Sequence, residues 1–213
     1  EEHAQQFRSA FVAIIGRPNV GKSTLVNALL GQKIAAVSPK PQTTRKRQLG
    51  ILTTDNAQLV FVDTPGIHSA RHKLGTFLNQ EAEEALEGVD VILWLVEIPA
   101  RPQEEDIQIA ALLSRVRSRI PVVLAANKID LIGPDVLAAR LEAYAGLLNK
   151  QVQIISISAT RNQNLDELQD LLISLAPIRP PEYDEEQITD SYERDIAACG
   201  GIRVTLPLTS PGS

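Results

Sequence analysis

Short apolar segments alternate with amphipathic segments along the chain from Phe11 to Leu175. The apolar segments are four to eight residues long and predict strands at 11–15, 48–53, 58–63, 90–97, 121–127 and 153–156. The amphipathic segments repeat apolar residues at helical spacing and predict helices at 22–30, 74–86, 103–116, 136–148 and 165–175. Asn164, followed by Glu167, resembles a capping box at the start of the last helix.

Several predicted strands are apolar without interruption, for example Val91 to Val96. Strands that are buried on both faces have this composition, and they belong to parallel sheets covered by helices. We therefore predict an α/β fold in three layers, with a doubly wound, mostly parallel six-stranded sheet. Trp94 is expected in the core, and ligands are expected at the carboxyl ends of the strands.

Two segments interrupt the alternation. Residues 32–47 are polar and punctuated by proline, and a loop of this length inside a domain is usually functional. Residues 176–190 are rich in proline and then acidic, which predicts an extended linker that leaves the domain.

The composition narrows the class of protein. With 213 residues, 44% hydrophobic and 22% charged, the chain is an ordinary soluble globular protein and not a disordered one. A net charge of −5 disfavours a broad nucleic-acid-binding surface, so an RNA contact would come from a local basic cluster, such as Arg45-Lys46-Arg47, or from a segment that is missing. Cys199 is the only cysteine, so no internal disulfide can form, and a cytoplasmic location is expected.

The most specific motif follows the first predicted strand, where Gly16-Arg17-Pro18-Asn19-Val20-Gly21-Lys22-Ser23 matches the phosphate loop of nucleotide-binding proteins. Its backbone N–H groups and the start of the next helix would surround phosphate oxygens. Lys22 would neutralise the β- and γ-phosphates, and the Ser23 hydroxyl would bind Mg²⁺. The residues expected to contact the nucleotide here are Gly16, Asn19, Val20, Gly21, Lys22, Ser23 and Thr24.

Two further motifs identify the ion and the base. Asp63-Thr64-Pro65-Gly66 follows a strand, where Asp63 can hold Mg²⁺ through water and the Gly66 N–H can reach a γ-phosphate; alone, this sequence is also a common turn. In Asn127-Lys128-Ile129-Asp130, the Asp130 carboxylate can accept hydrogen bonds from guanine N1–H and N2–H, a donor pair that adenine lacks. A nucleotide site for ATP is therefore disfavoured.

The remaining residues of the guanine motif have supporting roles. Lys128 can lay its aliphatic stem over the base, and Asn127 can tie this loop to the phosphate loop. Ser158-Ala159 follows the sixth predicted strand and can offer a backbone N–H to guanine O6.

This ordered set of motifs resembles the translation-factor-related GTPases over about residues 10–175, and the fold it implies is the P-loop G domain. The pieces Gln42-Thr43-Thr44-Arg45 and Gln187-Ile188-Thr189-Asp190 make the chain similar to the Era family of bacterial ribosome-assembly GTPases. The related Der and MnmE GTPases are the alternatives. The resemblance implies GTP or GDP and Mg²⁺ as ligands, and GTP hydrolysis as the activity.

The resemblance also implies a domain organisation and partners. Residues 1–9 would be an N-terminal extension, 10–176 the G domain, and 177–198 a linker toward an RNA-binding KH domain that the chain lacks. Residues 199–213 do not resemble the family's continuation, and we expect that they come from truncation or from added sequence. The whole protein would bind 16S rRNA and the small ribosomal subunit through the missing domain. It would also associate peripherally with the inner membrane.

Hydrolysis needs a positioned water and charge stabilisation. Ile67 stands where Ras-like GTPases have a catalytic glutamine, and we expect His68 to be solvated. The resemblance implies that Asn19 helps to bind K⁺, which would offset developing charge. Thr43 and Thr44 can both join the Mg²⁺ shell, and the motif alignment favours Thr44. The expected catalytic residues are Asn19, Lys22, Thr44 and Gly66, and the expected metal ligands are Ser23, Thr44 and Asp63.

The absence of a glutamine after Gly66 keeps a second interpretation open. The chain could be a docking module that is gated by guanine nucleotides and hydrolyses them negligibly without a partner.

Overall fold

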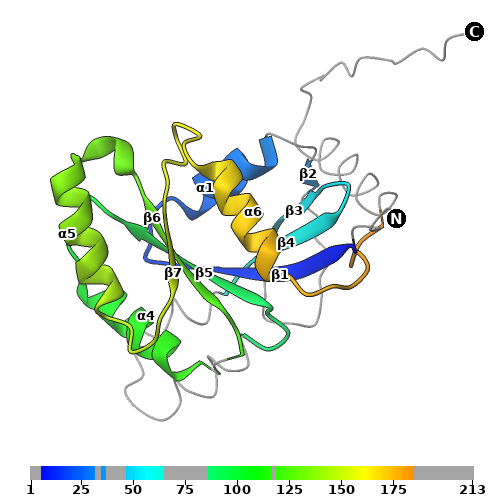
Figure 1. Cartoon of the computed structure of the whole chain (residues 1–213), viewed down its shortest axis with the longest axis horizontal. Coiled ribbons are helices and arrows are strands. Elements are labelled where there is room, and N and C mark those ends of the chain that lie inside the picture. The colour runs from blue at the N-terminus through cyan, green and yellow to red at the C-terminus, as the bar shows by residue number, and fades with distance from the viewer. Residues whose placement is uncertain (1–5, 32–34, 37–46, 65–85, 117–118, 185–213) are drawn as a thin grey trace, which may run out of the picture.

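The computed structural model describes residues 6–31, 35–36, 47–64, 86–116 and 119–184 (Figure 1). Its strands and helices alternate along the chain, as the periodicity predicts. The elements are β1 (Arg8–Ile15), α1 (Lys22–Gly31), β2 (Ala35–Ala36), β3 (Arg47–Thr53), β4 (Ala57–Asp63), β5 (Val91–Glu97), α4 (Glu104–Arg115), β6 (Val122–Asn127), the 3-10 turn η2 (Ile129–Leu131), α5 (Pro134–Ala145), β7 (Gln153–Ser156) and α6 (Leu165–Leu175).

The strands form one sheet in the order β2-β3-β4-β1-β5-β6-β7. From β4 through β7 the neighbouring strands are parallel, whereas β3 runs antiparallel to β4 and β2 antiparallel to β3. All six predicted strands are present, and the two-residue β2 adds a seventh. The predicted α/β fold with a mostly parallel sheet is confirmed.

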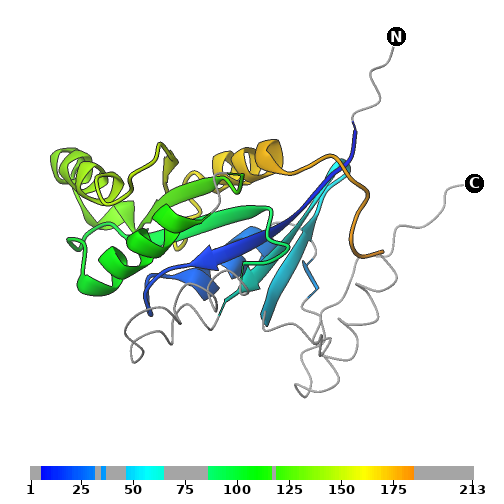
Figure 2. The same cartoon turned by 90° about the horizontal axis from the view of Figure 1, so that it is seen from below.

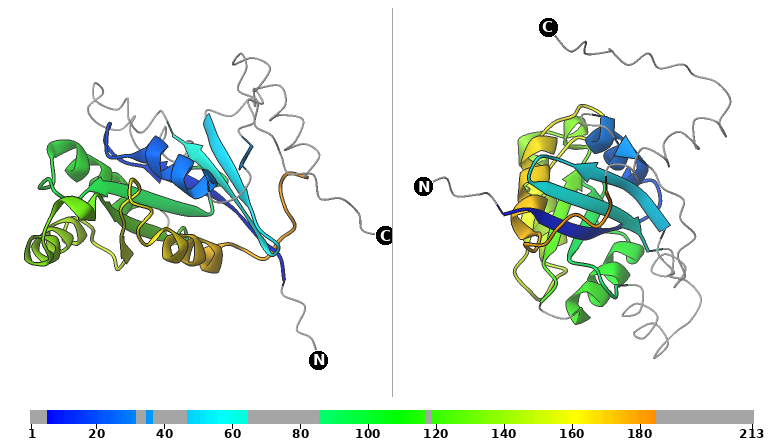
Figure 3. Two further views of the ribbon diagram at one scale, coloured as in Figure 1. Left: turned by 90° about the horizontal axis from the view of Figure 1, so that it is seen from above. Right: turned by 90° about the vertical axis from the view of Figure 1, so that its right-hand side faces the viewer.

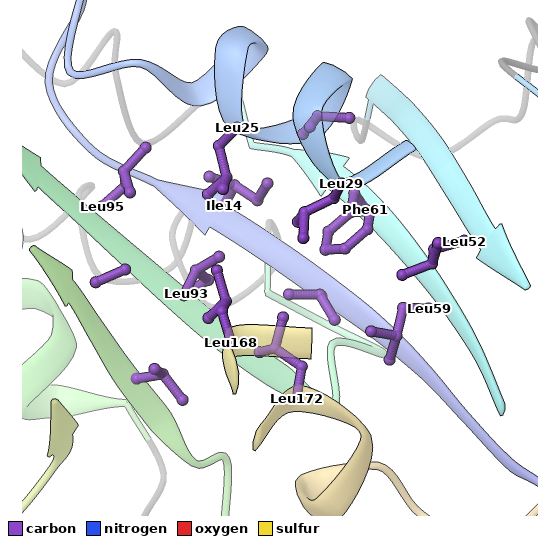
Figure 4. Packing of buried hydrophobic residues seen from close by; sticks show 14 of the residues in the cluster. Ile14, Leu25, Leu29, Leu52, Leu59, Phe61, Leu93, Leu95, Leu168 and Leu172 are labelled. Carbon is purple, nitrogen blue, oxygen red and sulfur yellow. The ribbon is translucent and has the colours of Figure 1, made fainter. Parts of the chain in front are cut away.

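Helices cover both faces of the twisted sheet (Figures 2 and 3). Because side chains alternate along a strand, Val12 and Ile14 of β1 face one layer, and Ala13 and Ile15 face the other. The first layer contains α1 and α6, which contribute Leu25, Leu29, Leu168 and Leu172 (Figure 4). The second layer contains α4 and α5. Trp94 is fully buried there, as expected.

Three helix predictions need comment. The helix predicted at 74–86 lies outside the described residues, except for Leu86. The helix predicted at 136–148 is α5, which begins earlier because Pro134 suits the first turn of a helix. The capping box at Asn164 is wrong: this residue has a left-handed φ of 58°, and its side-chain amide donates to the Ser156 carbonyl (2.7 Å) instead.

The first part of the predicted linker is extended and packs against the sheet. Ser9 N donates to the Pro177 carbonyl (3.1 Å), and Arg179 forms an ion pair with Asp90 (2.6 Å). The buried Gln58 side chain of β4 accepts from the backbone N–H of Tyr183 (3.0 Å) and donates to its carbonyl (2.9 Å). Residues 177–183 are thus held by the domain, and the domain boundary at 176 stays a prediction.

Within the part of the chain that the structure describes, no helix is long and apolar enough to cross a membrane.

Candidate nucleotide-binding site

The predicted site residues come together at the carboxyl ends of the central strands. The phosphate loop, residues 16–23, leaves β1, and β4 and β5 lie on opposite sides of that strand. Asp63 ends β4 opposite Ile14 of β1, and Asn127 ends β6 opposite Glu97 of β5. Ligands of doubly wound sheets bind at the carboxyl ends of the strands, at the point where the strand order reverses.

Two glycines allow the phosphate loop to pass close to its neighbours. A Cβ atom on Gly16 would collide with the carbonyl oxygen of Leu95. Gly21 has a φ of +104°, and a Cβ atom there would lie 2.5 Å from the Asn127 amide nitrogen. The glycine spacing of the motif is therefore explained by backbone conformation and by close approach.

Lys22 points back along the phosphate loop. Its ammonium donates to the carbonyl oxygens of Gly16 (2.7 Å) and Arg17 (2.9 Å). Burial lowers the pKa of Lys22 below its ordinary value, while the negative charge of Asp63 opposes this shift. The cation is thus held at the mouth of the loop, where an anionic ligand would stabilise its charged form.

Asn127 joins three loops. Its contact with the phosphate loop is the one that the sequence predicts. Its side-chain amide is buried, donates to the Val20 carbonyl (2.9 Å) and accepts from the Ala159 N–H (3.0 Å). One side chain therefore connects the phosphate loop, the guanine motif and the segment after β7.

Ser158 supports the guanine motif by a route that the sequence does not reveal. Its hydroxyl donates to Asp130 Oδ1 (2.6 Å), which orients the carboxylate expected to bind guanine. The backbone N–H groups of Ser158 and Ala159 donate within the protein, to the Gln163 carbonyl and to Asn127. The expected donation from one of them to guanine O6 stays a prediction, and the N–H concerned would have to share or exchange its present acceptor.

Further charged residues form ion pairs within and next to the phosphate loop. Lys128 Nζ donates to Glu97 Oε1 (2.6 Å) and to the Asn19 carbonyl (3.2 Å). Arg17 pairs with Glu97 (3.7 Å) and with Asp106 (2.9 Å). Neither Glu97 nor Asp106 was predicted from the sequence motifs. The available signal for Glu97 was a carboxylate at the end of a buried apolar strand.

Ser23, Thr24 and Asp63 also lie at this edge, at the start of α1 and the end of β4. Other predicted residues lie outside the described parts of the chain, namely Thr43, Thr44, Arg45, Lys46, Gly66, Ile67 and His68. Among the described residues there is no group of three or more His, Cys, Asp or Glu side chains that could hold a metal ion.

Known proteins resemble this chain in sequence and fold. GTPase Era of Clostridium botulinum (strain Hall) is 45% identical over 192 residues, which are 90% of this chain and 64% of that protein. An Era structure with MgGDPNP and a segment of 16S ribosomal RNA has a TM-score of 0.64 and 36% identity, over 85% of this chain and 61% of that chain. An Aquifex aeolicus Era variant bound to GDP and AlF₄⁻ has a TM-score of 0.60 and 38% identity, over 85% and 62% of the two chains.

These similarities confirm the resemblance to Era that the sequence motifs indicate. The chain spans about 64% of the length of the curated relatives that it matches. The family model described as "50S ribosome-binding GTPase" matches residues 11–128, which is more than half of the 213 residues. The chain therefore belongs to this family of GTPases.

Proposed function

We propose that this chain binds GTP and GDP with Mg²⁺ and hydrolyses GTP as a molecular switch of the Era type. The observation that carries the proposal is the double hydrogen bond of Asn127, which joins the phosphate loop to the guanine motif and to the segment after β7. A single nucleotide can then contact all three loops.

Each described residue has a chemical task in this proposal. Lys22 would exchange its contacts with two loop carbonyls for contacts with phosphate oxygens. Ser23 and Asp63 would hold Mg²⁺, which supplies charge neutralisation at the phosphates. Asp130, oriented by Ser158, would accept from the guanine N–H donors. Asn19 would help to bind K⁺, and Thr44 and Gly66 would complete the site around the γ-phosphate.

The base preference gives the sharpest test. Asp130→Asn replaces an acceptor by a donor at one side of the amide, so GDP affinity is expected to fall at least tenfold while xanthosine diphosphate affinity rises. Asp135→Asn, an exposed position at the start of α5, is the matched control and should bind GDP like the wild type. Equal binding of GDP and ADP by the wild type would refute the guanine assignment.

Hydrolysis is tested separately. GTP turnover is measured with Mg²⁺ in KCl and in NaCl, for the wild type and for Asn19→Asp. The proposal expects slow turnover that K⁺ stimulates and that the substitution weakens. Equal rates in both salts, unchanged by the substitution, would contradict the role of the cation.

The second candidate is a nucleotide-gated docking module with negligible hydrolysis of its own. It is favoured by Ile67, which cannot position a water through its side chain. Single-turnover GTP assays with and without small ribosomal subunits separate the two candidates, because a docking module would show hydrolysis only with the partner.

The role of the whole protein is proposed from its relatives. An Era relative forms a complex with 16S ribosomal RNA. We extend to the parent protein a role in small-subunit assembly, a cytoplasmic location and peripheral association with the inner membrane. Cosedimentation of the parent protein with small subunits and with vesicles of bacterial lipids tests these parts of the proposal.

A further inference from the structure

Four charged side chains of alternating sign form a row behind the phosphate loop. We call the row Lys128–Glu97–Arg17–Asp106 the charge ladder. Its successive N–O distances are 2.6 Å, 3.7 Å and 2.9 Å. It extends from the guanine motif, past the phosphate loop, to α4.

The end of the ladder at the guanine motif joins two unusual backbone conformations. Asn19 in the phosphate loop has a φ of +65°, and Lys128 in the guanine motif has a φ of +69°. Left-handed conformations are unfavourable for residues other than glycine, and they persist where surrounding contacts hold them. Here the Lys128 ammonium donates to the Asn19 carbonyl and to Glu97 Oε1, so one cation connects both loops.

The other end of the ladder is fixed to the body of the domain. Asp106 is fully buried, and its carboxylate accepts from the Gln103 backbone N–H (2.9 Å) and faces the Tyr144 hydroxyl (3.4 Å). Arg17 is bound to Asp106, and its side chain is only 13% exposed. The guanidinium of the phosphate loop is therefore directed into the protein.

Glu97 is the carboxylate between the two cations. It ends β5, a strand buried through the middle of the sheet, so its backbone has a fixed position. Oε1 contacts Lys128 and Oε2 contacts Arg17. Its side chain is 29% exposed, which leaves the contact with Lys128 stronger than a fully solvated ion pair.

We propose that Glu97 is a positioning residue that holds the guanine motif and the phosphate loop in register and thereby sets how long a guanine nucleotide stays bound. The inference rests on the proposed function, since it concerns the same nucleotide. Glu97 acts through Lys128 and Arg17 and touches neither base nor phosphate. Its effect is expected on binding of GDP and GTP alike, and the rate of the chemical step should be unchanged.

The test measures release of a fluorescent methylanthraniloyl-GDP from the full chain by stopped flow. Glu97→Gln keeps the size of the side chain and removes its charge, and it is expected to speed release about tenfold, the loss of one charge-assisted hydrogen bond. Single-turnover hydrolysis, with the protein in saturating excess over GTP, should stay within twofold of the wild-type rate. Glu97→Asp keeps the charge and should restore part of the slow release.

The matched control is Asp90→Asn. It makes the same chemical change just before β5, at the opposite end of that strand, and removes the ion pair with Arg179. It is expected to lower the thermal midpoint without changing release. A double variant of Glu97→Gln with Lys128→Met should speed release by less than the two single effects combined, because both substitutions break the contact between Glu97 and Lys128.

The outcomes are distinct. Release from Glu97→Gln that is as slow as from the wild type, or equal acceleration in Asp90→Asn, would overturn the positioning role while leaving nucleotide binding intact. Additive effects in the double variant would also overturn it. Failure of the wild type to bind GDP would instead refute the proposed function itself. If Glu97→Gln does not fold, Glu97→Asp and Lys128→Met carry the same comparison.

Discussion

Asn127→Asp is the substitution that examines the connection between the loops most directly. It exchanges the side-chain NH₂ for an oxygen and leaves size and shape unchanged. The acceptor for the Ala159 N–H is retained. The donor to the Val20 carbonyl, now 2.9 Å away, is replaced by an acceptor, so two oxygens face each other in a site where the residue is 2% exposed.

The expected cost follows from these contacts. Loss of a neutral hydrogen bond and an unpaired buried carbonyl together destabilise a protein by about 2–4 kcal/mol. For a domain of this size, that lowers the thermal midpoint by roughly 4–16 °C. Because the phosphate loop is no longer tied to the guanine motif, GDP affinity should fall as well.

The effect should depend on pH. Burial beside a carbonyl oxygen raises the pKa of the introduced carboxyl above its value in the unfolded chain. When protonated, this group can donate to the Val20 carbonyl and replace the lost bond. A group whose pKa is raised in the folded state stabilises the fold at pH values below its unfolded pKa. This stabilisation is lost as pH rises through its folded pKa. The deficit against the wild type should therefore be smaller at pH 5 than at pH 8.

The assay is urea unfolding without nucleotide at both pH values, followed by circular dichroism. Asn149→Asp makes the same chemical change at an exposed position and should shift the free energy of unfolding by less than about 0.5 kcal/mol. Equal midpoints for the two variants at both pH values would show that the Asn127 amide does not hold the phosphate loop.

Three further predictions concern separate parts of the domain. Gly21→Ala should lower the free energy of unfolding by about 1–3 kcal/mol and weaken GDP binding, because Gly21 has a φ of +104° and a Cβ atom there would contact Asn127. Gly31 has open space around it, so Gly31→Ala should leave the thermal midpoint and GDP affinity unchanged or slightly improved. Burial and the charge of the nearby Asp106 carboxylate raise the pKa of Tyr144 to about 12. The contribution of the neutral Tyr144 hydroxyl to the free energy of unfolding should therefore be fully present below pH 10 and be lost as pH rises toward 12. In Tyr144→Phe, the urea midpoint should lack this fall. Arg179→Gln removes ion pairs with Asp90 (2.6 Å) and Glu182 (3.0 Å), and it should lower the unfolding free energy by about 1 kcal/mol without changing GDP release. Altered release would show that these pairs affect the site.

Local patterns predicted the elements well. Periods of two and 3.6 residues follow from backbone geometry, and an unbroken apolar run such as Val91 to Val96 is typical of a strand buried on both faces. The antiparallel direction of β3 and the short strand β2 were not predicted from the apolar pattern, which gives the position of a strand but not its direction. The three residues between β3 and β4 form a connection of hairpin length, and that was the available signal for an antiparallel pair. The capping box at Asn164 was wrong because its side chain contacts the Ser156 carbonyl, outside the helix, instead of a backbone N–H of the helix.

The candidate site likewise contains residues whose roles the motifs predicted and others whose roles they did not. The motifs predicted that Asn127 ties two loops, because a buried amide offers both a donor and an acceptor and the fold brings the loops together. The roles of Ser158 and Glu97 could not be predicted from spacing. A serine or a glutamate at a strand end is common, and its task depends on which charged side chain lies opposite it.

The sequence alone therefore determined the alternating α/β architecture, the phosphate loop and the guanine motif, since glycine, lysine and aspartate at those spacings suit little chemistry besides phosphate and guanine binding. Only the tertiary structure decided what supports these motifs. Asp130 is oriented by Ser158, and Lys128 and Arg17 are bound to one carboxylate, Glu97. The physical reason is that hydrogen bonds and ion pairs depend on distance and burial, and folding sets both between residues that are far apart in the chain.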